Sequence, residues 1–257
     1  MGNVAVDMAD IRKSYGSIVA LDEVNLSVRS GEVTALVGDN GAGKSTLIKC
    51  LSGVHSPDSG TIRIRGEEAF IDSPGKAKEL GIETTYQDLA LASNLSVAKN
   101  IFLGREEVLG PNRLFGVLNK SKMRAQAQEL LEDLNIGDID PDALAGDLSG
   151  GQRQLVAISR TLLTDPEIVI MDEPTSALSV EGATQVLDLI RELREQGITV
   201  LLISHNLDHV LDVADRIKVL YQGMDAGVLE RDVATRDEIV SRMVSGLPDQ
   251  QPEDTVA

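Results

Sequence analysis

Short apolar runs rich in β-branched residues recur along the chain. Residues 33–37, 168–171 and 200–203 are each bounded by turn residues or charged residues, which is typical of strands buried on both faces of a mostly parallel sheet. An amphipathic stretch ahead of Gly197 has the period of a helix, with apolar residues at Val186, Leu189, Ile190 and Leu193. This alternation of strands and helices predicts a doubly wound α/β core.

The N-terminal part has a different pattern. Residues 18–29 and 61–65 alternate apolar and polar positions, which predicts antiparallel strands with one buried face. From residue 96 to about 163 the strand patterns give way to helical ones, most clearly at 120–134. These changes predict a helical insertion within an α/β domain.

The expected domain boundaries follow from these patterns. We expect one domain over residues 4–247, with a helical subdomain inserted at roughly 89–163. Residues 248–257 combine two prolines with acidic and polar side chains, which predicts a disordered tail.

Composition limits the classes of partner. The chain has 257 residues, 42% of them hydrophobic, with no Trp, three Phe and three Tyr, so its core must be aliphatic. Its formal net charge is −17, which argues against nucleic acid or an anionic lipid surface as the main partner, because both attract basic faces. The single Cys50 excludes an internal disulfide and fits a reducing compartment.

The apolar runs are too short to cross a membrane, since a transmembrane helix needs about 20 apolar residues. The N-terminal segment carries Asp7 and Asp10 and has no continuous apolar stretch, so no signal peptide is expected. Any association with a membrane is therefore expected to depend on a partner protein.

A glycine-rich segment follows the first of the predicted buried strands. It matches the P-loop pattern and has a strand before it and a helix after it. Glycines let backbone N–H groups surround phosphate oxygens, and the helix adds its positive N-terminal end. Lys44 would reach the β- and γ-phosphates, and the Ser45 hydroxyl would bind Mg²⁺. The expected nucleotide-binding residues are Gly38, Asp39, Asn40, Gly41, Ala42, Gly43, Lys44, Ser45 and Thr46.

Two carboxylates, Asp172 and Glu173, end the predicted strand at 168–171. Ligands of such folds bind at the carboxyl ends of parallel strands, so both side chains would lie beside the P-loop. Asp172 is expected to hold Mg²⁺ through its water shell, and Glu173 to accept a proton from the attacking water. Alone, such a pair is more often a solvated strand end, and the P-loop reverses that interpretation.

The segment Leu148-Ser-Gly-Gly-Gln152 lies between the P-loop and the two carboxylates. It resembles the signature of the ATP-binding-cassette ATPases, which place it in this order. The resemblance implies the α/β P-loop NTPase fold of that family, the ABC-ATPase fold, with an N-terminal antiparallel β-subdomain and a helical insertion subdomain. It also implies that two cassettes pair head to tail, so that the signature contacts ATP held by the other copy. The implied contacts are Ser149, Gly150, Gly151 and Gln152. Gln152 and Arg153 have two other interpretations: they orient the helix that follows the signature, or they are surface groups.

The same resemblance assigns three further residues. Tyr15 matches the aromatic residue that stacks on adenine, although alone it would be an ordinary surface tyrosine. Gln87 matches the glutamine that senses Mg²⁺ and the membrane partner. His205 matches the switch histidine that hydrogen-bonds the γ-phosphate and positions Glu173 and water. His55 is interpreted as a loop residue, and His209 as a helix-surface residue.

The sequence departs from the family at Ser179, where many cassettes have Asp. In the family that Asp helps to couple the two sites of the dimer. The departure leaves the coupling between sites open but does not affect the expectation of ATP binding. Sugar importers often depart from the family at this position too.

Segments 53–60, 81–88 and 100–105 resemble the ATPases of monosaccharide importers of the ribose, galactose, xylose and fructose type. The resemblance implies an ATPase that powers sugar import as a homodimer, peripheral to the cytoplasmic face of the cell membrane. The implied partners are permease subunits, contacted through the helical subdomain, and indirectly an extracellular sugar-binding protein. The alternatives are an importer of another solute, such as branched-chain amino acids, and a non-transport cassette.

The expected mechanism combines these parts. Two ATP molecules would be held between the cassettes, each by one P-loop and the opposing signature. Glu173 and His205 would position water for attack on the γ-phosphate, with Lys44 and Mg²⁺ stabilising the charge. Loss of that phosphate would remove the signature contacts and open the dimer.

Overall fold

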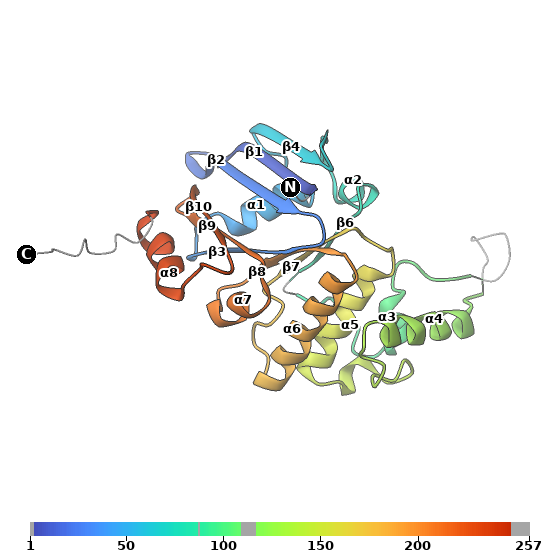
Figure 1. Ribbon diagram of the computed structural model, residues 1–257. Coiled ribbons are helices and arrows are strands. Elements are labelled where there is room, and N and C mark those ends of the chain that lie inside the picture. Colours follow the sequence, from blue (N-terminus) through green and yellow to red (C-terminus); the bar gives the residue numbers. More distant parts are fainter. Residues whose placement is uncertain (1–2, 87, 109–116, 248–257) are drawn as a thin grey trace, which may run out of the picture.

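The computed structural model describes residues 3–86, 88–108 and 117–247, which form two sheets and the helices around them (Figure 1). The smaller sheet is antiparallel, in the order β2-β1-β4-β5. Its strands are β1 (Val4–Tyr15), β2 (Ile18–Arg29), β4 (Ser59–Ile64) and β5 (Glu67–Glu68). The antiparallel strands predicted near residues 18–29 and 61–65 are thus confirmed as β2 and β4.

The larger sheet has six strands in the order β10-β9-β3-β8-β7-β6. Five of them run parallel, and β10 pairs antiparallel with β9 at one edge. The strands are β3 (Val33–Gly38), β6 (Ile82–Thr85), β7 (Ile168–Asp172), β8 (Thr199–Ile203), β9 (Arg216–Tyr221) and β10 (Met224–Glu230). All six residues of β3 are buried, as its mainly apolar sequence predicts.

One helix lies between the two sheets. This helix, α1 (Lys44–Leu51), buries Leu47, Ile48 and Leu51 in a core that takes side chains from both sheets. Figure 1 shows α1 beneath β1 and β2 and above β3. The shorter α2 (Pro74–Glu79) lies near β6. The start of α1 is therefore fixed at the carboxyl end of β3.

The other face of the six-stranded sheet carries the second core. Its apolar side chains come from the sheet and from a layer of helices, with Leu155, Ile190 and Val210 among them (Figure 1). These helices are α3 (Val97–Ile101), α4 (Lys120–Asp133), α5 (Gly150–Leu162), α6 (Val180–Glu195) and α7 (Leu207–Val213). The helix α8 (Arg236–Ser245) packs against β9 and β10.

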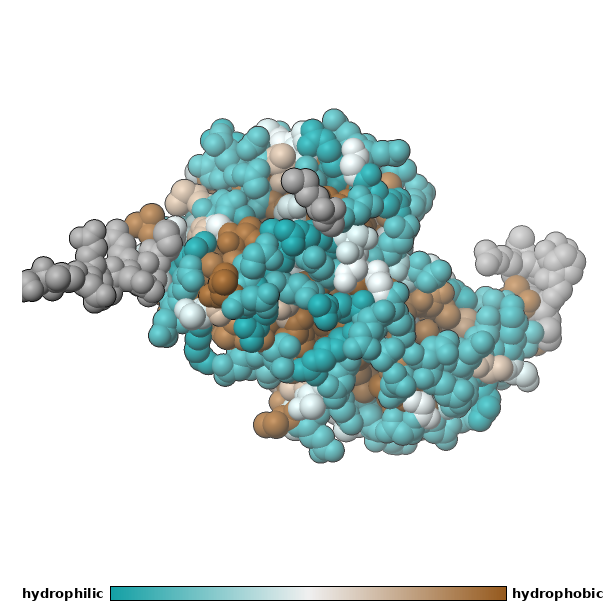
Figure 2. Space-filling model, in the orientation of Figure 1, coloured by the Kyte–Doolittle hydropathy of each residue, from teal (hydrophilic) through white to brown (hydrophobic). Residues whose placement is uncertain are grey.

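Within the described part of residues 89–163, the structure has α3, α4, a 3-10 turn at Ala145–Asp147 and α5, and no strand of either sheet. The expected tail at 248–257 lies outside the described residues. No helix in the described part of the chain combines the length and hydrophobicity needed to cross a bilayer. Figure 2 shows mainly hydrophilic residues on one face of the molecule, with apolar residues in small separate groups.

Candidate functional site

The P-loop joins the end of β3 to the first turn of α1. Gly43 is the N-cap of α1 and has a φ of 98°, a left-handed conformation that favours glycine. A Cβ atom at this position would lie 2.8 Å from the carbonyl oxygen of Ala20 and 2.8 Å from a methyl of Leu21. The loop can therefore close against β2 only with glycine here.

Lys44 begins α1 and folds back over the loop. Its Nζ donates hydrogen bonds to the carbonyl oxygens of Gly38, at 2.6 Å, and of Asp39, at 3.1 Å. Burial lowers the pKa of Lys44, and the carboxylates of Glu173, Asp39 and Asp172 oppose that shift. A partly desolvated ammonium group held at this point favours an anionic ligand.

A cavity of about 770 Å³ opens at this end of the six-stranded sheet. The P-loop, the two carboxylates and His205 meet in it, because β8 lies between β3 and β7 and the three strands end at the same edge of the sheet. The described residues that line it are Ile18, Val19, Ala20, Gly38, Asp39, Asn40, Gly41, Ala42, Gly43, Lys44, Ser45, Thr46, Asp172, Glu173, Ser176, Ile203, His205 and Met243. The whole predicted P-loop thus shares one cavity with both carboxylates and His205.

Asp172 ends β7, and Glu173 makes a sharp turn directly after it. Burial raises the pKa of Asp172, the Glu173 carboxylate adds to the shift, and Lys44 opposes it. Glu173 has a φ of 53°, which is uncommon for a residue other than glycine. Its backbone N–H donates to the carbonyl oxygen of Ile203 at 2.9 Å, so the turn is tied to the end of β8.

The Glu173 side chain contacts His205, which comes after β8 and Ser204 in the chain. His205 Nδ1 lies 2.8 Å from Glu173 Oε2. The His205 side chain is 70% exposed whereas that of Glu173 is only 16% exposed. A carboxylate with a histidine partner at the edge of a cavity can accept a proton from a water molecule and retain a fixed orientation.

The N-terminus of α5 carries the predicted signature residues. Ser149 Oγ accepts a hydrogen bond from the Gln152 backbone N–H at 3.1 Å, and Gln152 Oε1 accepts one from the Ser149 N–H at 3.0 Å. Arg153 Nη1 donates to the Leu148 carbonyl oxygen at 3.1 Å. Gln152 and Arg153 therefore orient the start of the helix. Among the described residues, none of 149–152 lines the P-loop cavity.

This arrangement is accompanied by a match to a known protein family. The sequence profile of the ABC transporter family matches residues 21–176, a span that includes the P-loop, the signature and both carboxylates. The chain belongs to the ABC transporter family. This cassette is an ATP-binding, ATP-hydrolysing subunit of an ABC transporter.

Individual relatives agree with this assignment. The xylose/arabinose import ATP-binding protein XylG of Sulfolobus acidocaldarius is 45% identical over 240 residues, which cover 93% of this chain and 94% of that protein. The ribose import ATP-binding protein RbsA of Chromobacterium violaceum is 44% identical over 241 residues, which cover 93% of this chain and 47% of that protein. The cassette thus spans nearly all of the first relative and about half of the second. A dimeric ATP-binding cassette solved in a post-hydrolysis state with ADP and Pi has a TM-score of 0.71 and 26% identity, covering 88% of this chain and 98% of that one.

The remaining predicted site residues of the cassette lie outside the P-loop cavity or outside the described residues. Tyr15 ends β1 and is 43% exposed, and its ring packs edge-on against His55 with ring centroids 5.6 Å apart. Tyr15 is not among the lining residues, although Ile18 in the same hairpin is. Gln87 lies outside the described residues.

Sequence analysis missed part of the surroundings of the site. Met243 of α8 and Ile18–Ala20 of β2 also line the cavity, and no chemical motif marks them.

The interpretation of His209 as a helix-surface residue needs correction. His209 lies on α7 but is half-buried, and both of its ring nitrogens contact polar atoms.

Proposed function

We propose that this cassette hydrolyses ATP as a homodimer and so powers the import of a monosaccharide through a permease. The observation that carries the proposal is the division of the predicted site within one chain. The P-loop, Asp172, Glu173 and His205 share a cavity, whereas residues 149–152 lie elsewhere. A second copy is the simplest source of a signature for that cavity.

In the proposed reaction, Glu173 is the general base. It accepts a proton from water as that water attacks the γ-phosphate, and His205 holds the carboxylate through the 2.8 Å contact. Lys44 and the N-terminal end of α1 bind the phosphates. The bond from the γ-phosphorus to the bridging oxygen breaks as the bond from water forms, so ADP is the leaving group and inorganic phosphate is the second product.

The oxygen donors beside the P-loop suit a magnesium ion. Ser45 and Asp172 both line the cavity, and hydroxyl and carboxylate oxygens are ligands that Mg²⁺ prefers. No group of three or more His, Cys, Asp and Glu side chains in the described residues could hold a metal, and Mg²⁺ in nucleotide sites commonly uses one or two protein ligands with water and phosphate. Bound there, the ion would neutralise charge on the phosphates. Gln87 is proposed as a further ligand on the resemblance alone.

The transported solute and the partners are proposed from the relatives. XylG and RbsA are named for import of pentose sugars, and the identity of 45% with XylG extends over 94% of that protein. We propose permease subunits as direct partners of the helical subdomain at 89–163, within a single domain at 4–247. An extracellular sugar-binding protein would be an indirect partner. The cassette would then be peripheral to the cytoplasmic face of the membrane.

The decisive variant is Glu173→Gln, measured by sedimentation with and without MgATP and by phosphate release. We expect it to bind ATP, to dimerise when MgATP is added and to lose turnover, because the amide does not accept the proton. Glu195→Gln is the matched control, since Glu195 is an exposed carboxylate at the far end of α6. Normal turnover by Glu173→Gln would remove it from its role as base. A variant that binds ATP but stays monomeric would contradict the homodimer.

The solute is tested separately in cells that lack the cassette. We expect loss of labelled pentose uptake with unchanged uptake of branched-chain amino acids. Normal pentose uptake with loss of branched-chain amino acid uptake would reassign the solute. It would not affect the assignment as an ATPase.

A further inference from the structure

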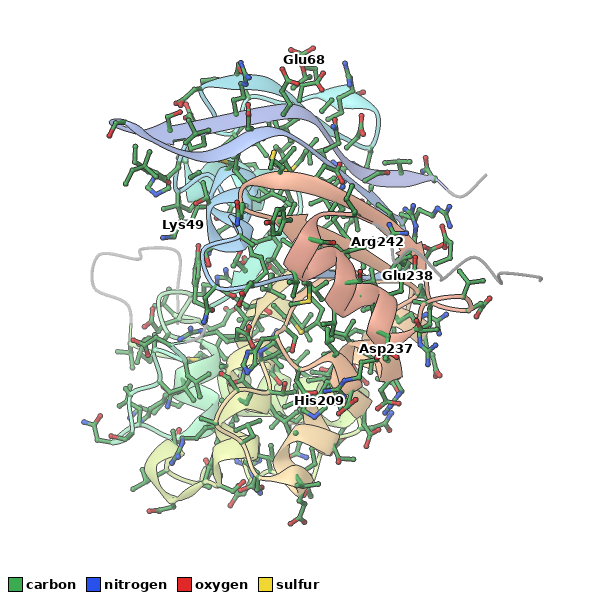
Figure 3. All side chains as sticks on the ribbon, turned by 90° about the vertical axis from the view of Figure 1, so that its left-hand side faces the viewer. Lys49, Glu68, His209, Asp237, Glu238 and Arg242 are labelled. Atoms are coloured by element: carbon green, nitrogen blue, oxygen red, sulfur yellow. The ribbon has the colours of Figure 1, made fainter. Side chains whose placement is uncertain are left out.

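His209 lies in the first turn of α7, with both ring nitrogens close to polar atoms. Its Nδ1 is 3.0 Å from Thr175 Oγ1, and its Nε2 is 3.2 Å from Asn206 Nδ2. Thr175 is buried and His209 is half-buried. Figure 3, which labels His209, shows it below α8 in that view.

The orientation of Asn206 fixes the direction of these two hydrogen bonds. Asn206 is the N-cap of α7, and its Oδ1 accepts from the backbone N–H groups of Asp208, at 3.1 Å, and His209, at 3.4 Å. The Nδ2 group therefore faces the ring, and an amide NH₂ can only donate. Nε2 must then accept, so the neutral ring carries its hydrogen on Nδ1 and donates it to Thr175.

The two hydrogen-bond partners of His209 are close in sequence to the proposed catalytic residues Glu173 and His205. Thr175 comes two residues after Glu173, and Asn206 follows His205 directly. The chain of bonds from Asn206 through His209 to Thr175 thus joins the loop after β7 to the loop after β8. The Glu173–His205 contact joins the same two loops at another point.

We propose that His209 is a positioning residue for ATP hydrolysis, because it holds these two loops at the spacing that the Glu173–His205 contact requires. The inference rests on the proposed roles of Glu173 and His205.

Two features of the pair make such a link necessary. Glu173 has a left-handed backbone, a conformation that persists only where surrounding contacts enforce it. His205 is largely exposed, so packing does little to hold it. A small displacement of a catalytic group lowers the rate strongly, and the link through His209 limits such displacement.

His209 itself is not placed to touch the nucleotide. It lines a neighbouring cavity of about 820 Å³, which Glu173 and His205 also line. It is absent from the described lining of the P-loop cavity. Its removal should therefore change turnover and leave nucleotide affinity nearly intact.

The test is steady-state ATPase kinetics of His209→Leu, which removes both hydrogen bonds. We expect kcat to fall about tenfold and KM for ATP to stay within twofold, because the interaction acts on the reacting geometry and not on binding. His209→Gln, which keeps a polar amide in reach of Asn206, should recover at least a third of wild-type kcat. Asp208→Asn is the matched control, since it alters an exposed neighbour whose partner is Arg236, and its kcat should be unchanged.

A double-mutant cycle separates positioning from a general loss of stability. Thr175→Val removes the hydroxyl and should lower kcat about as much as His209→Leu does. The two changes together should cause no further loss, because they break the same link. A kcat of His209→Leu within twofold of wild type, or fully additive losses, would overturn the proposal.

Parallel measurement of Glu173→Gln distinguishes the two levels of inference. Loss of turnover in Glu173→Gln, with normal turnover in His209→Leu, would refute only the positioning role. Normal turnover in Glu173→Gln would refute the proposed function and the role of His209 with it.

Discussion

Two helix N-termini of this cassette are proposed to meet ATP phosphates, and they are built in different ways. At α1 the N-cap is Gly43, which has no side chain to accept a hydrogen bond, and the first helical residue is Lys44. At α5 the N-cap is Ser149, whose side chain forms a reciprocal capping box with Gln152. The first terminus opens into a cavity, whereas the second is closed by its own side chains.

The difference indicates how each terminus obtains its geometry. The glycine cap lets the P-loop pack closely against β2. The backbone N–H groups of α1 remain available to an anion. The capping box holds α5 rigidly before any ligand is present. The packing of α5 against α6 then sets where the signature lies, and Gly151 approaches Gly182 so closely that an added Cβ would lie 2.7 Å from the Gly182 Cα. One terminus is shaped for its ligand, and the other is placed by packing.

The largest expected effect comes from removing the charge at the open terminus. Lys44→Ala should weaken ATP binding by roughly 100-fold, about 3 kcal/mol, because a charge-assisted contact to phosphate is lost. Calorimetric titration with MgATP measures the change directly.

Lys49→Ala is the matched control for charge. Lys49 lies further along the same helix and is exposed (Figure 3), so its removal should change the ATP affinity by less than about threefold. Equal affinities in the Lys44 and Lys49 variants would contradict the P-loop interpretation and with it the contrast between the two termini.

The open terminus was predictable from sequence because its parts are local. The strands β3, β7 and β8 are mainly apolar runs, and the P-loop or a catalytic candidate comes within two residues of the end of each strand. Parallel strands align their carboxyl ends, so local sequence and one rule of topology predict that Lys44, Asp172 and His205 lie close together.

The strand β1 was missed because its pattern is interrupted. Val6 and Met8 are buried two positions apart, and the next buried residue is Ile11, three positions later. Asp10 between them has a φ of 54°, and the pairing with β2 shifts register there, which is typical of a β-bulge. A bulge breaks the period of two on which strand prediction depends, even though β1 lies within the sheet and not at its edge.

The role of His209 was also beyond sequence analysis. Its partner Thr175 is 34 residues away in the chain, and nothing in the local pattern of α7 marks the contact. Only the meeting of the loops after β7 and β8 creates it. Contacts between loops depend on tertiary packing, which periodicity does not encode.

The second prediction alters the terminus that packing places. Gly151→Ala should destabilise the fold by about 1–3 kcal/mol, because the added methyl group overlaps the backbone of Gly182 and forces α5 away from α6. Unfolding in urea gives the change in the free energy of unfolding.

Gly150→Ala is the matched control one residue earlier. A Cβ there would meet only a methyl of Leu178, at 3.4 Å, so the free energy of unfolding should change by less than about 0.5 kcal/mol. Equal stability of the two variants would show that the close approach of Gly151 and Gly182 does not place the signature.

The smallest expected effect concerns Ser179, where many cassettes have Asp. Ser179 is the N-cap of α6, and its Oγ accepts from the Gly182 backbone N–H at 3.2 Å. Ser179→Ala should therefore lower the free energy of unfolding by about 1 kcal/mol. Ser179→Asp should stay within about 0.5 kcal/mol of wild type, because Asp caps helices as well as Ser does. Since Gly182 also contacts Gly151, a frayed α6 would loosen the signature helix as well. If Ser179→Asp were as unstable as Ser179→Ala, capping would not explain how this position tolerates either residue.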